Sequence, residues 1–157
     1  MVTIKELNAM HACSDGVEWY KVNKKKTLLL TLEEAKTDSE LNYFNWFVSR
    51  SLDKTNKIKY AIYEAEQVIN IFETKYPNDF RPRKAIEAAK NYLNDPSDTN
   101  KKADADADYA AYAAAAYAAY AAYAAAYAAY AADAAKFKMK KSILIYGLEL
   151  LKEQGIK

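Results

Sequence analysis

The segment from residue 109 to 135, YAAYAAAAYAAYAAYAAAYAAYAADAA, consists of alanine and tyrosine with a single aspartate. Alanine is the strongest helix former, so the sequence predicts one helix from about Lys102 to Lys136. At ~1.5 Å per residue such a helix is roughly 50 Å long, whereas a compact domain of this size is roughly 40 Å across. A helix of that length has to cross the whole domain, and the other helices are expected to pack around it.

The tyrosines of this tract share one face of the predicted helix. All of them except Tyr117, which lies at the edge, fall within about 80° on a helical wheel. Alanine on the other faces lets neighbouring helices approach closely, while the tyrosine rings fill a wider gap. An ice-binding rod would carry regularly spaced threonine, and the tract has none. A packed central helix is therefore favoured; an exposed tyrosine stripe would instead predict self-association into a homo-oligomer.

The chain has few residues that make turns. It contains three glycines and three prolines among 157 residues, which leaves few of the turns that a sheet protein needs. Its 52% hydrophobic content is enough for the core of one ordinary domain. We therefore expect residues 1–157 to form an all-α, single-domain helical bundle around the long Ala/Tyr helix.

Helix starts are indicated by two pairs with the spacing of a capping box. Thr3 with Glu6 predicts a helix from Thr3 to Met10, and Thr31 with Glu34 predicts a short helix of about one turn. Between them a helix after Gly16 carries Trp19, and residues 24–26 form a solvated lysine break.

Apolar residues at helical spacing predict the buried faces of four later helices. Pro77 ends the second of these helices, and Pro82 lies in the first turn of the third. The predicted buried positions are Leu41, Phe44, Phe47, Val48 and Leu52; Ile58, Ile62, Ala65, Ile69 and Phe72; Ile86, Ala89 and Leu93; and Ile143, Leu144, Leu148 and Leu151. Core positions are also favoured over interface positions for Trp19, Trp46 and Tyr43.

Charge and cysteine content name no partner by themselves. The net charge of +2 is neither a strong basic excess nor a strong acidic one, so nucleic acid is not a favoured partner. The single cysteine excludes an internal disulfide, and the N-terminal sequence has no secretory signal. We expect a cytoplasmic protein that does not associate with membranes.

No catalytic or metal-binding arrangement is evident. His11 and Cys13 are two residues apart, so their side chains diverge on a helix, and no second histidine or cysteine completes a zinc site. Asp104, Asp106 and Asp108 alternate as in a calcium loop, but the required glycine and glutamate are missing, and helix capping explains them better. We expect no enzyme activity, no cofactor and no metal.

A block of basic residues lies at the start of the predicted helix that contains Pro82, where positive charge is unfavourable. Arg81, Arg83 and Lys84 crowd a helix N-terminus, where the helix dipole disfavours cations. Asp79, Glu87 and Glu64 or Glu66 are the carboxylates that could clamp the arginines in a structural corner. Alternatively, the block docks an acidic partner or a phosphate.

Several segments together resemble a known family. CSDGVEW, NWFVSR, AIYEAEQVINIFETKYPNDFRPRKAIEAAKNYL and the Ala-rich helix resemble the immunity-protein family of bacterial polymorphic toxin systems, which also occurs in phages. The resemblance implies an all-α protein that binds and neutralises a toxin, and it supplies no catalytic residues. Relatives mix other residues into the tract, so it does not point to a shared binding face there.

The leading hypothesis is a non-catalytic protein inhibitor of a toxin or defence effector. Its candidate partner-binding residues are Arg81, Arg83, Lys84 and Asp79, together with Arg50 at the end of NWFVSR. One alternative is nucleic-acid binding by residues 24–26, residues 138–141 and the Arg block. The other is a small-molecule (nucleotide) binder with a pocket between the arginines and the aromatic helices.

Overall fold

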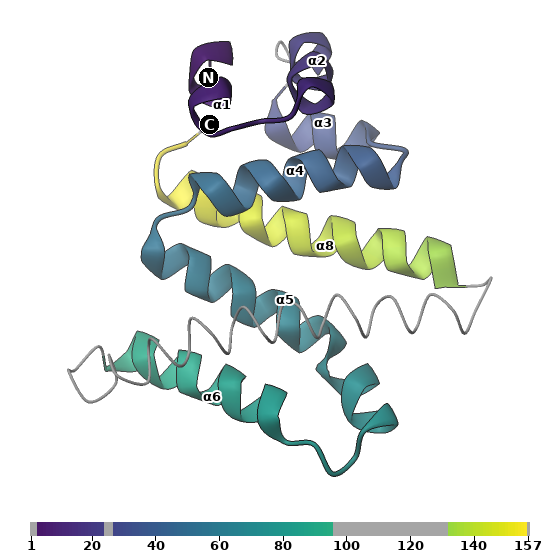
Figure 1. Ribbon diagram of the computed structural model, residues 1–157, viewed down its shortest axis with the longest axis vertical. Coiled ribbons are helices and arrows are strands. Elements are labelled where there is room, and N and C mark those ends of the chain that lie inside the picture. Colours follow the sequence, from purple (N-terminus) through teal and green to yellow (C-terminus); the bar gives the residue numbers. More distant parts are fainter. Residues whose placement is uncertain (1–2, 24–26, 96–131, 157) are drawn as a thin grey trace. The chain divides into compact units, whose positions relative to one another are not determined.

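The structure is a computed structural model, and it describes residues 3–23, 27–95 and 132–156. Within these ranges the chain forms seven helices and no strand (Figure 1), which confirms the predicted all-α class. None of these helices combines the length and the apolar character that crossing a bilayer requires. The helices are α1 (Ile4–Ala9), α2 (Ser14–Asn23), α3 (Leu28–Glu34), α4 (Asp38–Ser51), α5 (Lys54–Lys75), α6 (Arg81–Asn94) and α8 (Ala132–Glu153).

The described residues divide into two compact units. Unit 1 comprises those of 1–53 and 140–157, and unit 2 comprises those of 54–139. The Ala/Tyr tract lies outside the described residues up to its last few positions, so the central helix that the sequence predicts is not confirmed. The single-domain bundle stays a prediction.

Unit 1 is organised around α4 and the C-terminal part of α8, which lie side by side (Figure 1). Near the start of α4, Lys140 pairs with Asp38 at 3.2 Å. Beyond its end, Gln154 accepts a hydrogen bond from the Asp53 backbone N–H (3.1 Å) and donates one to the Ser51 carbonyl (3.4 Å). The earlier residue, Lys140, contacts the start of α4, and the later one, Gln154, contacts the residues at and after its end. The two segments therefore run parallel.

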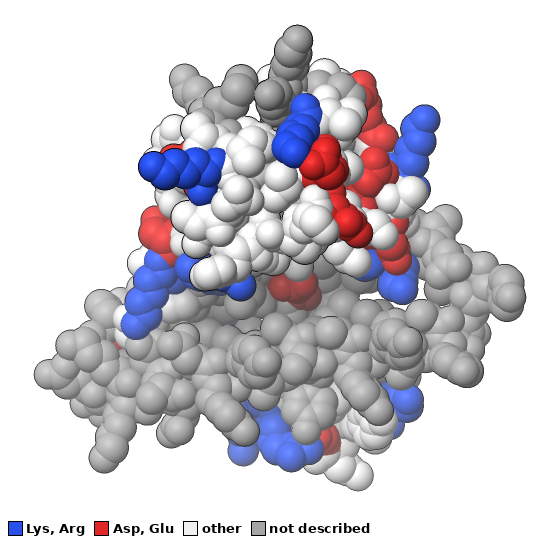
Figure 2. Space-filling model, turned by 45° about the horizontal axis from the view of Figure 1, so that its top comes forward, with Lys and Arg blue, Asp and Glu red and all other residues white. Residues whose placement is uncertain are grey.

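The core of unit 1 contains the most deeply buried large side chains of the described chain. They come from α3, α4 and α8, and the stripe predicted for α4 is buried throughout. Figure 2 shows a broad uncharged surface over the N-terminal helices, with acidic side chains gathered along one side of it. The fully buried side chains are Phe44, Leu32, Leu41, Leu144, Leu151 and Val48.

Unit 2 contains the antiparallel pair α5 and α6. The pair buries Ile62, Ala65 and Ile69 from α5 against Ala85, Ile86 and Ala89 from α6, with Ile58 and Leu93 partly buried beside them. As predicted, α5 ends just before the Tyr76–Pro77 step, and Pro82 lies in the first turn of α6.

The N-cap of α3 differs from the prediction. Thr27, not Thr31, caps the helix by accepting the backbone N–H of Leu30 at 3.2 Å. Thr31 lies inside α3, where it is buried and its hydroxyl donates to the Thr27 carbonyl at 2.9 Å. A threonine inside a helix can bond back to the preceding turn, so the spacing of Thr31 and Glu34 was not a capping box.

Other helix boundaries also differ. α2 begins at Ser14 and contains Gly16, whereas the sequence predicted a helix that starts after Gly16. Thr37, at which no cap was predicted, forms a full capping box with Glu40 at the start of α4. Lys136, predicted to end the tract helix, lies inside α8, which is continuous from Ala132 to Glu153. The buried stripe predicted for α8 is confirmed at Ile143, Leu144 and Leu151. Leu148, also predicted, is only half-buried, whereas Leu150, which was not predicted, is buried.

Leu144 and Ile145 are adjacent on α8 but differ in burial, with exposed fractions of 2% and 42%. Leu144→Ala is expected to lower the free energy of unfolding by about 2–5 kcal/mol, because it leaves a cavity in the core. Ile145→Ala is the matched control and is expected to cost under ~1 kcal/mol. Urea unfolding of both variants checks this, and equal losses would contradict the core described for unit 1.

Candidate functional site

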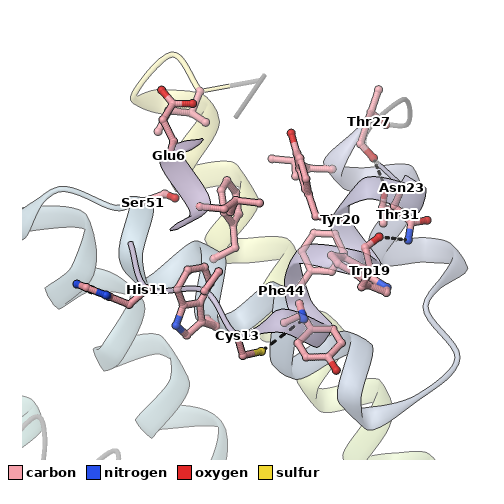
Figure 3. A pocket seen from close by; sticks show the side chains of 18 of the residues that line it. Glu6, His11, Cys13, Trp19, Tyr20, Asn23, Thr27, Thr31, Phe44 and Ser51 are labelled. Carbon is pink, nitrogen blue, oxygen red and sulfur yellow. Dashed lines mark hydrogen bonds between the residues drawn. The ribbon is translucent and has the colours of Figure 1, made fainter. Parts of the chain in front are cut away.

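Unit 1 contains a partly open cavity of about 770 Å³. Side chains from α1, α2, α3 and α4, together with Gly155 and Ile156 after α8, line it. Figure 3 shows it from close by, with Trp19 and Phe44 inside and Glu6 and Tyr20 toward its upper end. Its volume is within the ~300–1,000 Å³ typical of ligand sites.

The end of α1 forms one edge of this cavity through a Schellman motif. The N–H of Ala12 donates to the Leu7 carbonyl, and the N–H of His11 donates to the Asn8 carbonyl, both at 3.0 Å. The motif requires a left-handed residue, and His11 has a φ of 61°. His11 therefore ends a helix, and its side chain is exposed.

The end of α8 repeats the motif at another edge of the cavity. The N–H of Ile156 donates to the Leu151 carbonyl, and the N–H of Gly155 donates to the Lys152 carbonyl, both at 3.0 Å. Gly155 has a φ of 82°, which favours glycine. Gly155 thus caps α8, and Ile156, which follows it, lines the cavity.

Aromatic side chains of α2 and α4 form the interior of the cavity. The ring of Trp19 packs against Phe44 in an edge-to-face arrangement at 5.2 Å between centroids, and against Tyr43 at 5.8 Å. Trp46 and Tyr43 are half-buried lining residues. The predicted core positions of Trp19, Trp46 and Tyr43 are thus cavity walls rather than closed core.

Few polar groups line the cavity, and α1 fixes one of them. Oε2 of Glu6 accepts the backbone N–H of Thr3 at 2.6 Å and its hydroxyl at 2.8 Å. These hydrogen bonds, the one from the backbone first, lower the pKa of Glu6. Burial, and secondarily the charge of Glu6, raises the pKa of Tyr20. Glu6 is therefore an ionised group on the side of the cavity where Tyr20 lies.

The buried indole N–H of Trp19 has no well-aligned acceptor among the described residues. Glu40 lies close to this indole. A hydrogen bond from the backbone N–H of Lys36 is the main cause that lowers the pKa of Glu40, and Trp19 contributes to the lowering. Hydrogen-bond strength falls steeply with misalignment, so proximity to Glu40 leaves this N–H poorly satisfied.

No metal site lies at this cavity within the described chain. No group of three or more potential metal ligands occurs among the residues that can be placed. His11 is exposed after α1, and the Cys13 sulfur accepts the backbone N–H of Gly16 at 3.4 Å. Cys13 and His11 both line the cavity, although no local spacing in the sequence indicates that the fold places them beside the aromatic residues.

The predicted basic block lies in unit 2, at the corner between α5 and α6. Arg81 forms a two-point pair with Asp79, with Nε–Oδ1 at 2.8 Å and Nη2–Oδ2 at 2.6 Å. Arg83 forms another with Glu73 on α5, at 2.5 and 2.6 Å. Each guanidinium is thereby compensated at a helix start that disfavours cations.

The proposed carboxylate partners were only partly right. Asp79 pairs with an arginine as expected, but Glu73 was missed, and Glu66 pairs with Lys90 instead. Lys84 is exposed and has no ion pair among the residues that the structure describes. The fold brings Glu73 to Arg83 across the turn between the helices, ten residues apart in the chain, which local spacing could not indicate.

Exposed apolar side chains occur in the same stretch of the chain as these ion pairs. Phe80 is 58% exposed, and Tyr76 and Ile71 are also exposed. Phe80 is the N-cap residue of α6 but makes no side-chain cap, so its ring is not required by the helix start. We name Ile71, Tyr76, Phe80, Arg81 and Lys84 the α5–α6 corner. The sequence signal was the aromatic residues beside the basic block, which the sequence reasoning did not use.

Arg50, the remaining predicted site residue, belongs to unit 1. Its guanidinium stacks on the ring of Trp46 at 5.6 Å from the centroid, on the same helix. The inclusion of Arg50 in a partner site stays a prediction.

Comparisons with protein-family models, with curated proteins and with solved structures found no match to this chain.

Hydrogen bonds from Arg81 lower the pKa of Asp79 to about 2. A carboxyl group with a depressed pKa stabilises the fold above its unfolded pKa of about 3.9, and this stabilisation is lost as pH falls toward about 2. In Arg81→Met the Asp79 pKa should rise toward its ordinary value. Carbon-detected NMR titration checks this, and an unchanged pKa would contradict the pair.

Gly155→Ala is expected to lower the free energy of unfolding by about 1 kcal/mol, because a side chain is strained at its left-handed φ. His11→Gly relieves the corresponding strain at the end of α1 and is expected to be neutral or stabilising. Urea unfolding measures both. A harmless Gly155→Ala would show that the end of α8 is not fixed in this conformation.

Proposed function

We propose that this chain is a non-catalytic inhibitor that binds and neutralises a protein target, a toxin or a defence effector, through the α5–α6 corner. The observation that carries the proposal is the exposure of Phe80 and Tyr76 beside Arg81, whose side chain is 78% exposed although Asp79 holds it in place. Aromatic residues and arginine dominate the binding energy of protein interfaces.

The paired arginines favour this use of the corner. Asp79 orients the guanidinium of Arg81 before any partner arrives, so less side-chain entropy is lost on binding. Arg83 is less exposed than Arg81, at 47% against 78%, and its hydrogen bond to Glu73 is the main cause of its raised pKa. Arg81, Lys84 and the Phe80 ring are therefore the groups that a partner with acidic and apolar residues would contact.

The resemblance to toxin immunity proteins supports the same proposal. The segment that carries it most specifically, IFETKYPNDFRPRKAIEAA, includes Ile71, Glu73, Tyr76, Phe80, Arg81 and Arg83. The part of the chain with that resemblance is therefore the part that forms the exposed corner.

The nucleic-acid alternative gains less support. Lys140 and Lys141, two of its cations, contact Asp38 and the Glu33 carbonyl within unit 1. Arg81 and Arg83 pair with carboxylates. Contacts with phosphate would have to replace these interactions.

Capture from cells of the native host, followed by affinity measurement with the purified target, tests the proposal. Phe80→Ala is expected to weaken binding by at least ~2 kcal/mol, roughly 30-fold, because interface aromatic residues carry that much. Arg81→Glu should abolish binding by repelling an acidic partner. Both should melt within a few degrees of the unmodified chain, since both side chains are exposed.

Lys57→Glu is the matched control, since Lys57 is an exposed cation near the other end of α5. This variant should bind the target normally. Equal loss of binding in Lys57→Glu and Arg81→Glu would indicate a general charge effect and contradict a site at the corner. Turnover of a substrate by substoichiometric protein would contradict the proposal of a non-catalytic inhibitor.

A further inference from the structure

The cavity of unit 1 has a chemistry that the proposed function does not use. Among the described residues, six aromatic rings line it, and they include both tryptophans of the chain. The faces of aromatic rings carry negative electrostatic potential and attract cations. The rings are Trp19, Tyr20, Tyr43, Phe44, Trp46 and Phe47.

Among the described residues that line the cavity, the charged side chain is acidic. Glu6 is one of these residues, and no lysine or arginine is among them. Its Oε2 is held by Thr3, and Oε1 accepts no hydrogen bond from the described residues. In Figure 3 the carboxylate of Glu6 and the hydroxyl of Tyr20 lie at the same end of the cavity. One carboxylate oxygen at that rim therefore remains for a ligand.

Acidic residues behind the walls reinforce this sign. Burial raises the pKa of Tyr43, and the charge of Asp15 adds to the effect. Glu40 lies close to Trp19. Arg50 stacks on the Trp46 ring and is not among the described lining residues, so a ring of this wall already attracts a cation.

We propose that the cavity of unit 1 binds an organic cation with an apolar body. The ammonium group lies at the rim between Glu6 and Tyr20, and an aryl or alkyl body fills the space among the tryptophan and phenylalanine rings. An anionic ligand is repelled by the ionised carboxylate of Glu6, and a neutral ligand gains no attraction from it. A cavity of about 770 Å³ has room for a molecule of drug-like size.

The chain carries two built-in reporters of binding. Both of its tryptophans line the cavity, so the whole tryptophan fluorescence comes from residues that a ligand bound there would contact. Its single cysteine, Cys13, also lines the cavity and is exposed, so a bound ligand should slow its reaction with a thiol reagent.

The test uses the full chain and three ligands of similar size: 3-phenylpropyltrimethylammonium, neutral 4-phenylbutanamide and anionic 4-phenylbutanoate. The cation is expected to change tryptophan fluorescence saturably, to slow Cys13 labelling, and to bind about tenfold more tightly than the amide. The carboxylate should bind more weakly still. Failure of the cation to bind, or equal binding of all three, would overturn the proposal.

Substitutions distinguish the contribution of the Glu6 charge to binding from that of the aromatic rings. Glu6→Gln keeps the capping geometry, because glutamine can replace glutamate in a capping box, and should weaken the cation about tenfold while leaving the amide unchanged. Glu149→Gln, an exposed residue of α8 in the same unit, removes the same charge as a matched control and should have no effect. Equal effects of the two variants would contradict a role for Glu6.

Tyr20→Leu provides a second variant that keeps apolar volume and both tryptophans. It should weaken the cation about two- to fivefold, as loss of one cation–π contact does, with little change for the amide. A larger loss for the amide than for the cation would overturn the assignment of the rim. Phe80→Ala should bind the cation normally, so failure at the cavity and failure at the α5–α6 corner are distinguishable.

Discussion

The parallel pairing of α4 with the C-terminal part of α8 is the interaction on which unit 1 depends. It brings residues 38–53 next to residues 140–154, which are about a hundred positions apart in the chain, and Gln154 closes one end with two backbone hydrogen bonds. Five of the six fully buried large side chains lie on these two helices. Burying each contributes about 1.5–3 kcal/mol, which offsets the entropy of holding distant segments together. One side of α4 is thereby committed to the core, and Tyr43 and Trp46 remain for the cavity wall.

Local periodicity predicted much of the helical core. The stripe from Leu41 to Leu52 is buried because a helix with apolar residues three and four apart has one face to bury, whatever its neighbour. The cap at Thr27 was not predictable in this way, since Thr31 offers the same residue type and a better-spaced glutamate. The pair of Arg83 with Glu73 and the cavity depend on tertiary packing, which spacing within a single helix does not contain. The Schellman motif at His11 was hidden because no glycine, the usual residue at this left-handed position, marks it in the sequence.

The two units carry different surface chemistry. Unit 2 places arginine and exposed aromatic side chains at the α5–α6 corner, a composition suited to a protein partner. Unit 1 places aromatic rings around a cavity with a carboxylate at its rim, a composition suited to a small cation. Both proposals describe recognition by contact, and each rests on side chains that are held in place before binding, by Asp79 in one unit and by Thr3 in the other. Preorganisation of this kind reduces the entropy lost on binding.

Hydrogen exchange of the chain in complex with its purified protein target is the most direct test of recognition at the α5–α6 corner. The account predicts slower exchange of backbone amides from Tyr76 to Lys84, while amides of α1 and α2 keep the rates of the unbound chain. Unchanged exchange across residues 76–84, with protection confined to other helices, would contradict it.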